Sequence, residues 1–285
     1  MNYQEHAITF SCNAEPLYGI ASVPETPSRR GVLIIVGGPQ YRVGSHRQFA
    51  LLARSLATQG IPALRFDYRG MGDSCGDARD FEDVGQDLRA AIDQFIGVVP
   101  GMQEVAVWGL CDGASAAMFY AAGDARVCGL VLLNPWVRTA GGHAKATLKH
   151  YYRDRLLQPA LWRKIFAGKF DYRRAIGAFS ALLVAARGKG ATPAAAVVAA
   201  TPAPLPERMF DGLSRFNGKV LLILSGRDLT AQEFSEVVKA SRPWQKLLGS
   251  ARVTRKELAE ADHTFSRHAW RDQVSTWTGD WIKSW

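Results

Sequence analysis

The chain has 285 residues, enough for one sizeable α/β domain with an insertion or for two small domains. Its apolar fraction of 47% is typical of a soluble globular protein, and no apolar run approaches the roughly 20 residues needed to cross a bilayer. We expect no secretory signal peptide, because no apolar stretch follows a basic start. The cysteines lie far apart with no CxxC pair, which argues against a zinc site and a disulfide framework and predicts a reduced, cytoplasmic protein.

The net charge of +9 is concentrated in one segment of the chain. Residues 138–215 contain fourteen Lys or Arg and four acids, so the remainder of the chain sums to −1. Such an excess is either a solvated helical face or an attraction for an anionic substrate or an acidic lipid or polysaccharide surface. No recognition motif for nucleic acid accompanies it, so we expect no nucleic-acid partner.

Alternating apolar runs and helical patterns indicate the fold class. The N-terminal residues predict a β-hairpin, with strands at 7–12 and 17–23. Continuous apolar runs then predict strands buried on both faces, at 32–36, 63–68, 105–110, 130–133 and 220–224. Helical spacing separates them at 46–59, where Ser45 can cap the helix, and at 81–98, 113–122, 232–248 and 267–281. This order predicts an α/β protein, a three-layer sandwich around a mainly parallel sheet.

The alternation stops after Asn134-Pro135. Residues 137–216 contain helical patterns but no strand-like run, and 188–206 are rich in Ala, Pro and Gly. We therefore expect a core of residues 1–136 and 217–285, with residues 137–216 inserted as a helical cap over the carboxyl edge of the sheet. Its aromatic residues either line an acyl pocket, together with Trp136, or form the core of the cap: Tyr151, Tyr152, Trp162 and Phe166.

The segment 105–117 predicts a strand, a sharp turn and a helix, with Gly109-Leu-Cys-Asp-Gly113 at the turn. Glycines flank the turn because a Cβ would obstruct neighbouring backbone. Cys111 occupies the position of the usual serine nucleophile. The N-terminus of the following helix favours its thiolate form.

Two further residues complete a catalytic set. Asp228 follows the strand run at 220–224, and His263 follows a last strand predicted at 252–258. The chain order Cys111, Asp228, His263 is the nucleophile, acid and base order of α/β-hydrolases. We expect Cys111 to attack an acyl carbon, His263 to transfer the proton and Asp228 to fix the imidazole tautomer.

An acyl-transfer site also needs two N–H donors for the oxyanion. The amide of Asp112, directly after the nucleophile, is one candidate. Gly38 is the second, with Gln40 as the fallback, because the intervening Pro39 has no N–H. Gln40 and Trp136 are also candidates for substrate contact. The Asp112 carboxylate would oppose a thiolate, so it either points away, to an Arg such as Arg42 or Arg69, or takes part in substrate handling.

Four motifs together resemble the α/β-hydrolase fold: Gly109-Leu-Cys-Asp-Gly-Ala-Ser115, Gly37-Gly-Pro-Gln-Tyr-Arg-Val-Gly-Ser-His46, Asp67-Tyr-Arg-Gly-Met-Gly-Asp-Ser74 and Asp262-His-Thr-Phe-Ser266. They are most similar to exosortase A system-associated hydrolases of the first type. That resemblance implies a bacterial cytosolic hydrolase linked to exopolysaccharide production, and it fixes no substrate. The catalytic set also resembles that of dienelactone hydrolase, and the Gly-x-Cys-x-Gly turn resembles polyhydroxyalkanoate synthases.

The sequence therefore predicts a hydrolase that cleaves a small-molecule ester or thioester through an acyl-cysteine, without metal or organic cofactor. One alternative is an acyltransferase that uses the same intermediate. A second alternative is a non-catalytic protein of this fold that binds an acyl or sugar ligand.

Overall fold

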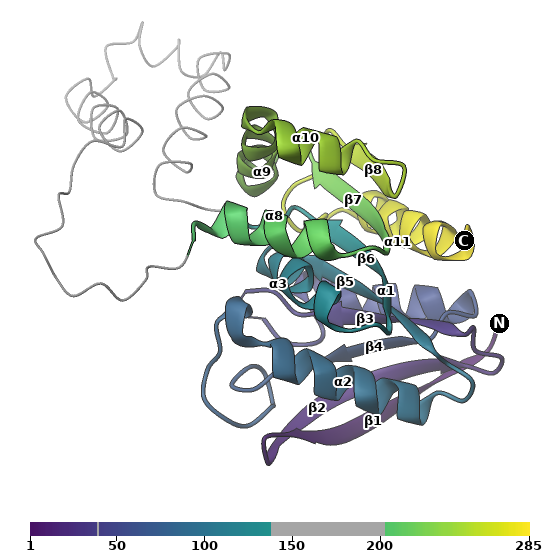
Figure 1. The fold of residues 1–285 in the computed structure, drawn as a ribbon. Helices are drawn as coiled ribbons and strands as arrows, with labels where there is room; N and C mark the ends of the chain where they lie inside the picture. The colour runs from purple at the N-terminus through teal and green to yellow at the C-terminus, as the bar shows by residue number, and fades with distance from the viewer. Residues whose placement is uncertain (39, 138–202) are drawn as a thin grey trace, which may run out of the picture.

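The structure is a computed structural model that describes residues 1–38, 40–137 and 203–285. Its centre is an eight-stranded sheet in the order β1-β2-β4-β3-β5-β6-β7-β8 (Figure 1). The hairpin strands β1 and β2 pair antiparallel, β2 pairs antiparallel with β4, and all remaining pairs are parallel. The strands are β1 (Tyr3–Cys12), β2 (Glu15–Pro24), β3 (Arg30–Ile35), β4 (Ala63–Phe66), β5 (Glu104–Leu110), β6 (Val127–Leu133), β7 (Lys219–Ser225) and β8 (Val253–Leu258).

Helices cover both faces of this sheet, which confirms the predicted three-layer α/β sandwich. One face packs against α1 (Gln48–Thr58) and α11 (His268–Lys283), and the other packs against α2 (Gly85–Val98), α3 (Asp112–Tyr120), α8 (Leu205–Arg215) and α9 (Leu229–Ala240). Along β3, Val32 and Ile34 face the first pair of helices, whereas Leu33 and Ile35 face the second group. Strands buried on both faces explain why the sequence shows continuous apolar runs.

Two helix predictions need correction. The pattern at 232–248 forms two helices, α9 and α10 (Arg242–Leu248), because Pro243 in the first turn of α10 cannot continue the preceding helix. Ser45 does not cap α1: the capping position is Arg47, with φ 60°, and no side chain caps the helix there. The Ser45 hydroxyl and amide instead donate to the side-chain oxygen of Gln40.

The position of helix α8 shows that the predicted cap cannot extend to residue 216. Met209 and Leu213 are fully buried in the core, and a Cβ on Gly212 would lie 2.4 Å from the Met118 carbonyl oxygen of α3. Residues 205–215 are therefore part of the helical layer of the sandwich and not of a cap. The remainder of the predicted cap, with its aromatic residues Tyr151, Tyr152, Trp162 and Phe166, lies outside the described residues.

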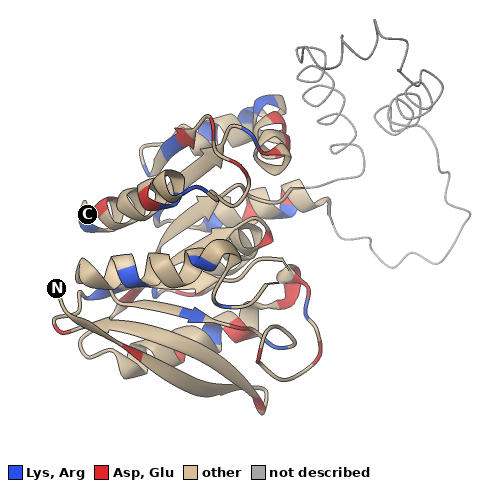
Figure 2. Ribbon diagram, turned by 180° about the vertical axis from the view of Figure 1, so that it is seen from behind, with Lys and Arg blue, Asp and Glu red and all other residues tan. Residues whose placement is uncertain are grey.

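Acidic and basic side chains are interspersed over the described elements (Figure 2). Most of the basic excess belongs to residues 138–202, outside the described part of the chain. Among the described helices, none is both long and apolar enough to span a bilayer.

Candidate active site

Cys111 lies on a strained turn between β5 and α3. Its backbone has φ 61° and ψ −124°, a conformation that non-glycine residues rarely adopt. A Cβ on Gly109 would lie 2.4 Å from the Gly113 carbonyl, and one on Gly113 would lie 3.0 Å from the Ile35 carbonyl oxygen. The two glycines thus permit the close backbone approach that the turn requires. The turn leaves Cys111 half-buried at the carboxyl edge of the sheet.

Asp228 lies at the carboxyl end of β7 and begins α9. Its buried carboxylate accepts hydrogen bonds from the amides of Thr230 and Ala231, at 3.2 and 3.1 Å. An aspartate at a helix N-terminus is a favourable cap, so the fold holds this side chain in place. Its Oδ2 also lies 2.9 Å from Nδ1 of His263.

The His263 side chain contacts both Asp228 and Cys111. With Nδ1 facing Asp228, the imidazole also interacts with the Cys111 side chain. Burial lowers the pKa of His263, but hydrogen bonds to Asp228 and Cys111 and their charges raise it, with a net value of about 10. An imidazole with this pKa is protonated at neutral pH, which is the state that stabilises a neighbouring thiolate. The structure therefore brings together Cys111, Asp228 and His263 from three separate loops.

Asn134 connects these loops, a role that the sequence did not suggest. Its side-chain amide donates to the carbonyl of His263 at 3.0 Å, and its Oδ1 accepts from the Ser225 amide at 2.9 Å. It also donates to the Ser225 hydroxyl. The residue is fully buried and adopts φ 43°. The only signal in the sequence was an amide residue directly after a predicted strand.

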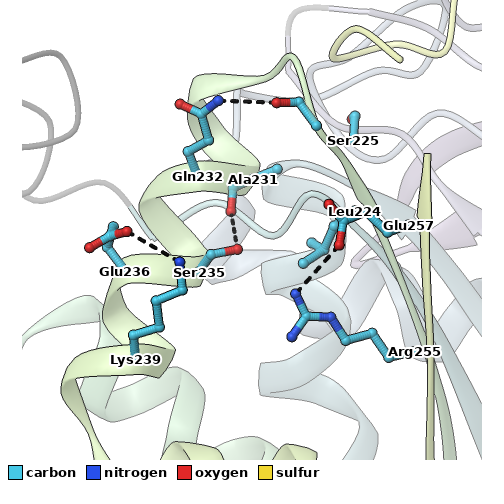
Figure 3. A pocket seen from close by; sticks show the side chains of 10 residues that line it. Leu224, Ser225, Ala231, Gln232, Ser235, Glu236, Lys239, Arg255 and Glu257 are labelled. Atoms are coloured by element: carbon cyan, nitrogen blue, oxygen red, sulfur yellow. Dashed lines mark hydrogen bonds and ion pairs between the residues drawn. The ribbon is translucent and has the colours of Figure 1, made fainter. Parts of the chain in front are cut away.

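Gln232, in the first turn of α9, stabilises the turn that contains Asp228 through two hydrogen bonds. Its Nε2 donates to the Gly226 carbonyl at 3.1 Å, and its backbone amide donates to the Asp228 carbonyl at 3.1 Å. Figure 3 shows this side chain at one end of a polar pocket of about 290 Å³ between α9 and β8. The residues that line this pocket include neither Cys111 nor His263, so the pocket is separate from the candidate catalytic residues.

The two predicted oxyanion donors lie beside each other, but one of them is engaged. The Gly38 amide donates to the Asp112 carboxylate, at 2.8 Å to Oδ1 and 2.9 Å to Oδ2. The Asp112 amide lies in the first turn of α3, where helix N–H groups have no intrahelical partner. Of the two alternatives for the Asp112 side chain, the one in which it points to Arg42 or Arg69 is wrong, because Arg42 pairs with Asp67 and Asp73 and Arg69 pairs with Asp87.

Gln40 and Trp136 both lie near this turn. The Gln40 side chain is used within its own loop, where it donates to the Gly37 carbonyl at 3.1 Å and accepts from Ser45. The Gln40 amide donates to the Gly38 carbonyl at 2.8 Å. Trp136 is half-buried, and its amide donates to the Cys111 carbonyl at 3.2 Å. Trp136 is therefore beside the nucleophile, whereas Gln40 shapes the loop that carries Gly38.

No group of three or more His, Cys, Asp or Glu side chains within the described ranges is arranged to hold a metal ion. All four cysteines of the chain are free thiols.

Comparisons with known proteins match this architecture. The esterase Pf2001 of Pyrococcus furiosus superposes with a TM-score of 0.65 at 16% identity, over 99% of this chain and 93% of that chain. A putative hydrolase from Agrobacterium vitis gives 0.57 at 19% identity, over 99% of this chain and 100% of that one. An esterase domain from Rhodothermus marinus gives 0.58 at 18% identity, over 98% of each chain. At these identities the likeness is one of fold.

Sequence comparison adds one relative and one family. The polyketide transferase grgF of Penicillium sp is 29% identical over 118 residues, so the match spans 40% of this chain and 40% of that relative. A model described as alpha/beta hydrolase family matches residues 32–275, from the start of β3 into α11. The chain belongs to the alpha/beta hydrolase family.

Proposed function

We propose that this protein cleaves a carboxylic ester or thioester through an acyl-cysteine intermediate. The observation that supports this proposal is the hydrogen-bonded series from Asp228 through His263 to Cys111, placed at the carboxyl edge of the sheet. The membership of the alpha/beta hydrolase family supports the same reaction class. The closeness of an imidazole to the thiol is what nucleophilic catalysis by cysteine needs.

The proposed reaction has two half-reactions. The Cys111 thiolate attacks the acyl carbonyl, and the oxyanion that forms accepts a hydrogen bond from the Asp112 amide. His263 then protonates the departing alcohol or thiol, which leaves the acyl group on Cys111. In the second half-reaction His263 takes a proton from water as the water attacks the acyl-cysteine, and the carboxylic acid product leaves with the thiolate restored.

Activated esters and thioesters suit this nucleophile best. The tetrahedral adduct can expel either the Cys111 sulfur or the leaving group of the substrate. Because a thiolate leaves readily, a substrate with a poor leaving group would lose the sulfur again and return to the starting ester. A substrate with a good leaving group makes the tetrahedral adduct collapse towards the acyl-enzyme. We propose a small-molecule acyl substrate of this kind.

The test is a screen of acyl-p-nitrophenyl esters and acyl-CoA thioesters of graded chain length, with mass detection of the acylated peptide. We expect the acyl mass on the peptide that contains Cys111, and its loss in Cys111→Ala. Cys75→Ala is the matched control, because Cys75 is an exposed cysteine. A full rate of turnover in Cys111→Ala would contradict the acyl-cysteine mechanism.

A second candidate is acyl transfer to an alcohol or amine. The partial similarity to a polyketide transferase favours it. Water and an acceptor compete for the same acyl-enzyme, so decay of the acyl-enzyme with and without candidate alcohols distinguishes the two reactions. Faster decay with formation of a new ester assigns transfer. A third hypothesis is a non-catalytic protein that binds an acyl or sugar ligand. It replaces both reactions if acyl-directed electrophiles label none of the cysteines and cells that carry Cys111→Ser have the wild-type phenotype.

The basic segment, residues 138–215, supports an anionic substrate or contact with an acidic surface. From the resemblance to exosortase-associated hydrolases we also propose a cytoplasmic protein linked to exopolysaccharide production. Four residues of the basic segment provide the test of the charge: Arg153, Arg155, Arg163 and Lys164. Replacing them by Gln should raise KM for acyl-CoA thioesters, with a smaller effect at high salt because surface charges are then screened. An unchanged KM at low salt would show that these charges only keep the segment solvated.

A further inference from the structure

The Asp112 carboxylate occupies an unusual position for a side chain next to a nucleophile. Its Oδ1 accepts hydrogen bonds from the Gly38 amide at 2.8 Å and from the Gly113 amide at 2.9 Å, and its Oδ2 lies 2.9 Å from the Gly38 nitrogen. The three donated contacts come from backbone N–H groups on the two loops that frame Cys111. The carboxylate therefore binds where an anionic oxygen of a reacting acyl group needs a donor.

The neighbouring backbone is shaped to accept this carboxylate. A Cβ on Gly37 would lie 2.3 Å from Asp112 Oδ1 and 2.5 Å from the Leu110 carbonyl oxygen. Any other residue at position 37 would therefore collide with the carboxylate or push it away. The absence of a side chain at Gly37 lets the loop after β3 approach Asp112 closely enough for its amide to donate.

Within the described part of the chain, the Asp112 carboxylate forms no ion pair with the two arginines named in the sequence-based alternatives, Arg42 and Arg69. The two arginines considered for it are paired elsewhere, Arg42 with Asp67 and Asp73 and Arg69 with Asp87. Burial raises the pKa of Asp112, the backbone amides of Gly38, Gly113 and Asp112 itself lower it, and the charge of Asp80 raises it, with a net increase. The backbone amides thus offset only part of the cost of burying this charge, and backbone amides are also the groups that stabilise an oxyanion.

We propose that Asp112 is an internal competitor for the oxyanion-binding position, which the acyl oxygen of the substrate must displace before Cys111 is acylated. This inference rests on the proposed function of the same site. Both oxygens of the Asp112 carboxylate already lie within 2.9 Å of the Gly38 nitrogen, so an acyl oxygen can reach this N–H only after the carboxylate has moved away. Asp112 is half-buried, so rotation of its side chain can release the amide towards substrate.

The displacement has a kinetic consequence. Hydrogen bonds that exist in the resting enzyme and are broken before the transition state lower the acylation rate. One oxyanion donor is typically worth on the order of 100-fold in rate. Freeing the Gly38 amide should therefore increase acylation by up to about 100-fold, which makes the prediction a gain of activity.

The experiment measures single-turnover acylation of Cys111 by an acyl-p-nitrophenyl ester, from the burst of p-nitrophenolate. Alkylation of Cys111 by iodoacetamide is measured beside it, because alkylation needs the thiolate but forms no oxyanion. In Asp112→Ala we expect acylation to rise by about 10- to 100-fold, while alkylation rises by much less. Asp112→Asn keeps an oxygen acceptor without the charge, so its acylation should rise by a smaller factor.

Asp80→Ala is the matched control. It removes a carboxylate whose charge acts on Asp112, but it leaves the Gly38 amide occupied. Acylation in this variant should stay close to that of the wild type. The inference is wrong if Asp112→Ala acylates no faster than the wild type, or if alkylation rises by the same factor, which would assign the effect to the thiolate. Should Asp112→Ala fail to fold, the Asp112→Asn variant decides by the same comparison.

Failure of the underlying function has a different signature. If folded wild type and every variant release no p-nitrophenolate and carry no acyl mass on Cys111, the proposed function is wrong. If the wild type is acylated and the Asp112 variants are not faster, only the present inference is wrong.

Discussion

The side chain of Asn134 donates a hydrogen bond to the backbone carbonyl of His263 across 129 residues of sequence, at 3.0 Å. The same side chain binds both the amide and the hydroxyl of Ser225. The loop with the base is thus connected to the strand that leads to the acid, through a residue that touches neither reacting group. In the proposed mechanism, Asn134 is therefore a positioning residue for His263.

Replacing Asn134 by Ala should lower both stability and turnover. The Ser225 amide and the His263 carbonyl would be left buried without partners, which costs about 1–3 kcal/mol for each unsatisfied group. We expect kcat to fall with KM nearly unchanged, because the base moves while the substrate surface remains. Urea unfolding and steady-state kinetics measure the two effects. A loss of stability with unchanged kcat would limit Asn134 to a structural role.

The four thiols should differ in reactivity towards iodoacetamide at pH 7. Burial raises the pKa of Cys12 and raises the pKa of Cys128 to about 11, so both should react slowly. Cys75 is exposed and provides the comparison. If the neighbouring imidazole activates Cys111 as proposed, its rate should be at least about tenfold higher than that of Cys75. Mass spectrometry of the labelled peptides measures each rate.

In His263→Ala the labelling of Cys111 should slow towards that of Cys75, because the imidazolium that stabilises the thiolate is gone. The rate at Cys75 itself should not change. Equal rates at all four cysteines of the wild type would contradict activation of Cys111.

Stability should depend on the charge of His263 over a defined pH range. The folded-state pKa of about 10 lies above the ordinary value of 6.5. The imidazolium therefore stabilises the folded state fully below about pH 6.5, and this contribution is lost as the pH rises through 10. The stability advantage of the wild type over His263→Gln should shrink between these values. A stability difference that stays constant between these pH values would contradict this contribution of His263.

Removing one partner of the buried ion pair between Arg69 and Asp87 should strongly destabilise the folded state. Asp87 is fully buried and Arg69 is 3% exposed, and their side chains form two hydrogen bonds of 2.9 Å. Asp87→Ala leaves the guanidinium uncompensated, which should cost about 3–5 kcal/mol in the free energy of unfolding. Asp83→Ala, which breaks the exposed pair with Arg79, should cost at most about 1 kcal/mol. Similar losses in the two variants would contradict the role of burial.

Much of the fold could be predicted because each element carries a local signal. The strands β3, β5, β6 and β7 are buried on both faces, so their apolar runs were continuous and easy to assign. The helix boundaries were less accurate. Pro243 interrupts the pattern at 232–248, and α8 belongs to the core although the sequence before it contains no strand-like run.

The candidate site divides in the same way. The residues Cys111, Asp228 and His263 could be placed because each follows a predicted strand, and the carboxyl ends of parallel strands meet at one edge of the sheet. The partner of Asp112 could not be predicted, because backbone amides are present at every position and leave no signal in the sequence. The same holds for Asn134, whose role depends on contacts between loops that are distant in the chain.

The position of Trp136 has a consequence for how substrate preference can change in this family member. The chain leaves the sheet there, one residue after Pro135, and its amide is bonded to the carbonyl of Cys111. The end of β6 is therefore held next to Cys111, and β6 pairs in parallel with β7, the next described strand along the chain. Replacing the half-buried Trp136 should thus alter acyl-chain preference in the proposed reaction, while the pairing of β6 with β7 keeps the thermal midpoint close to that of the wild type.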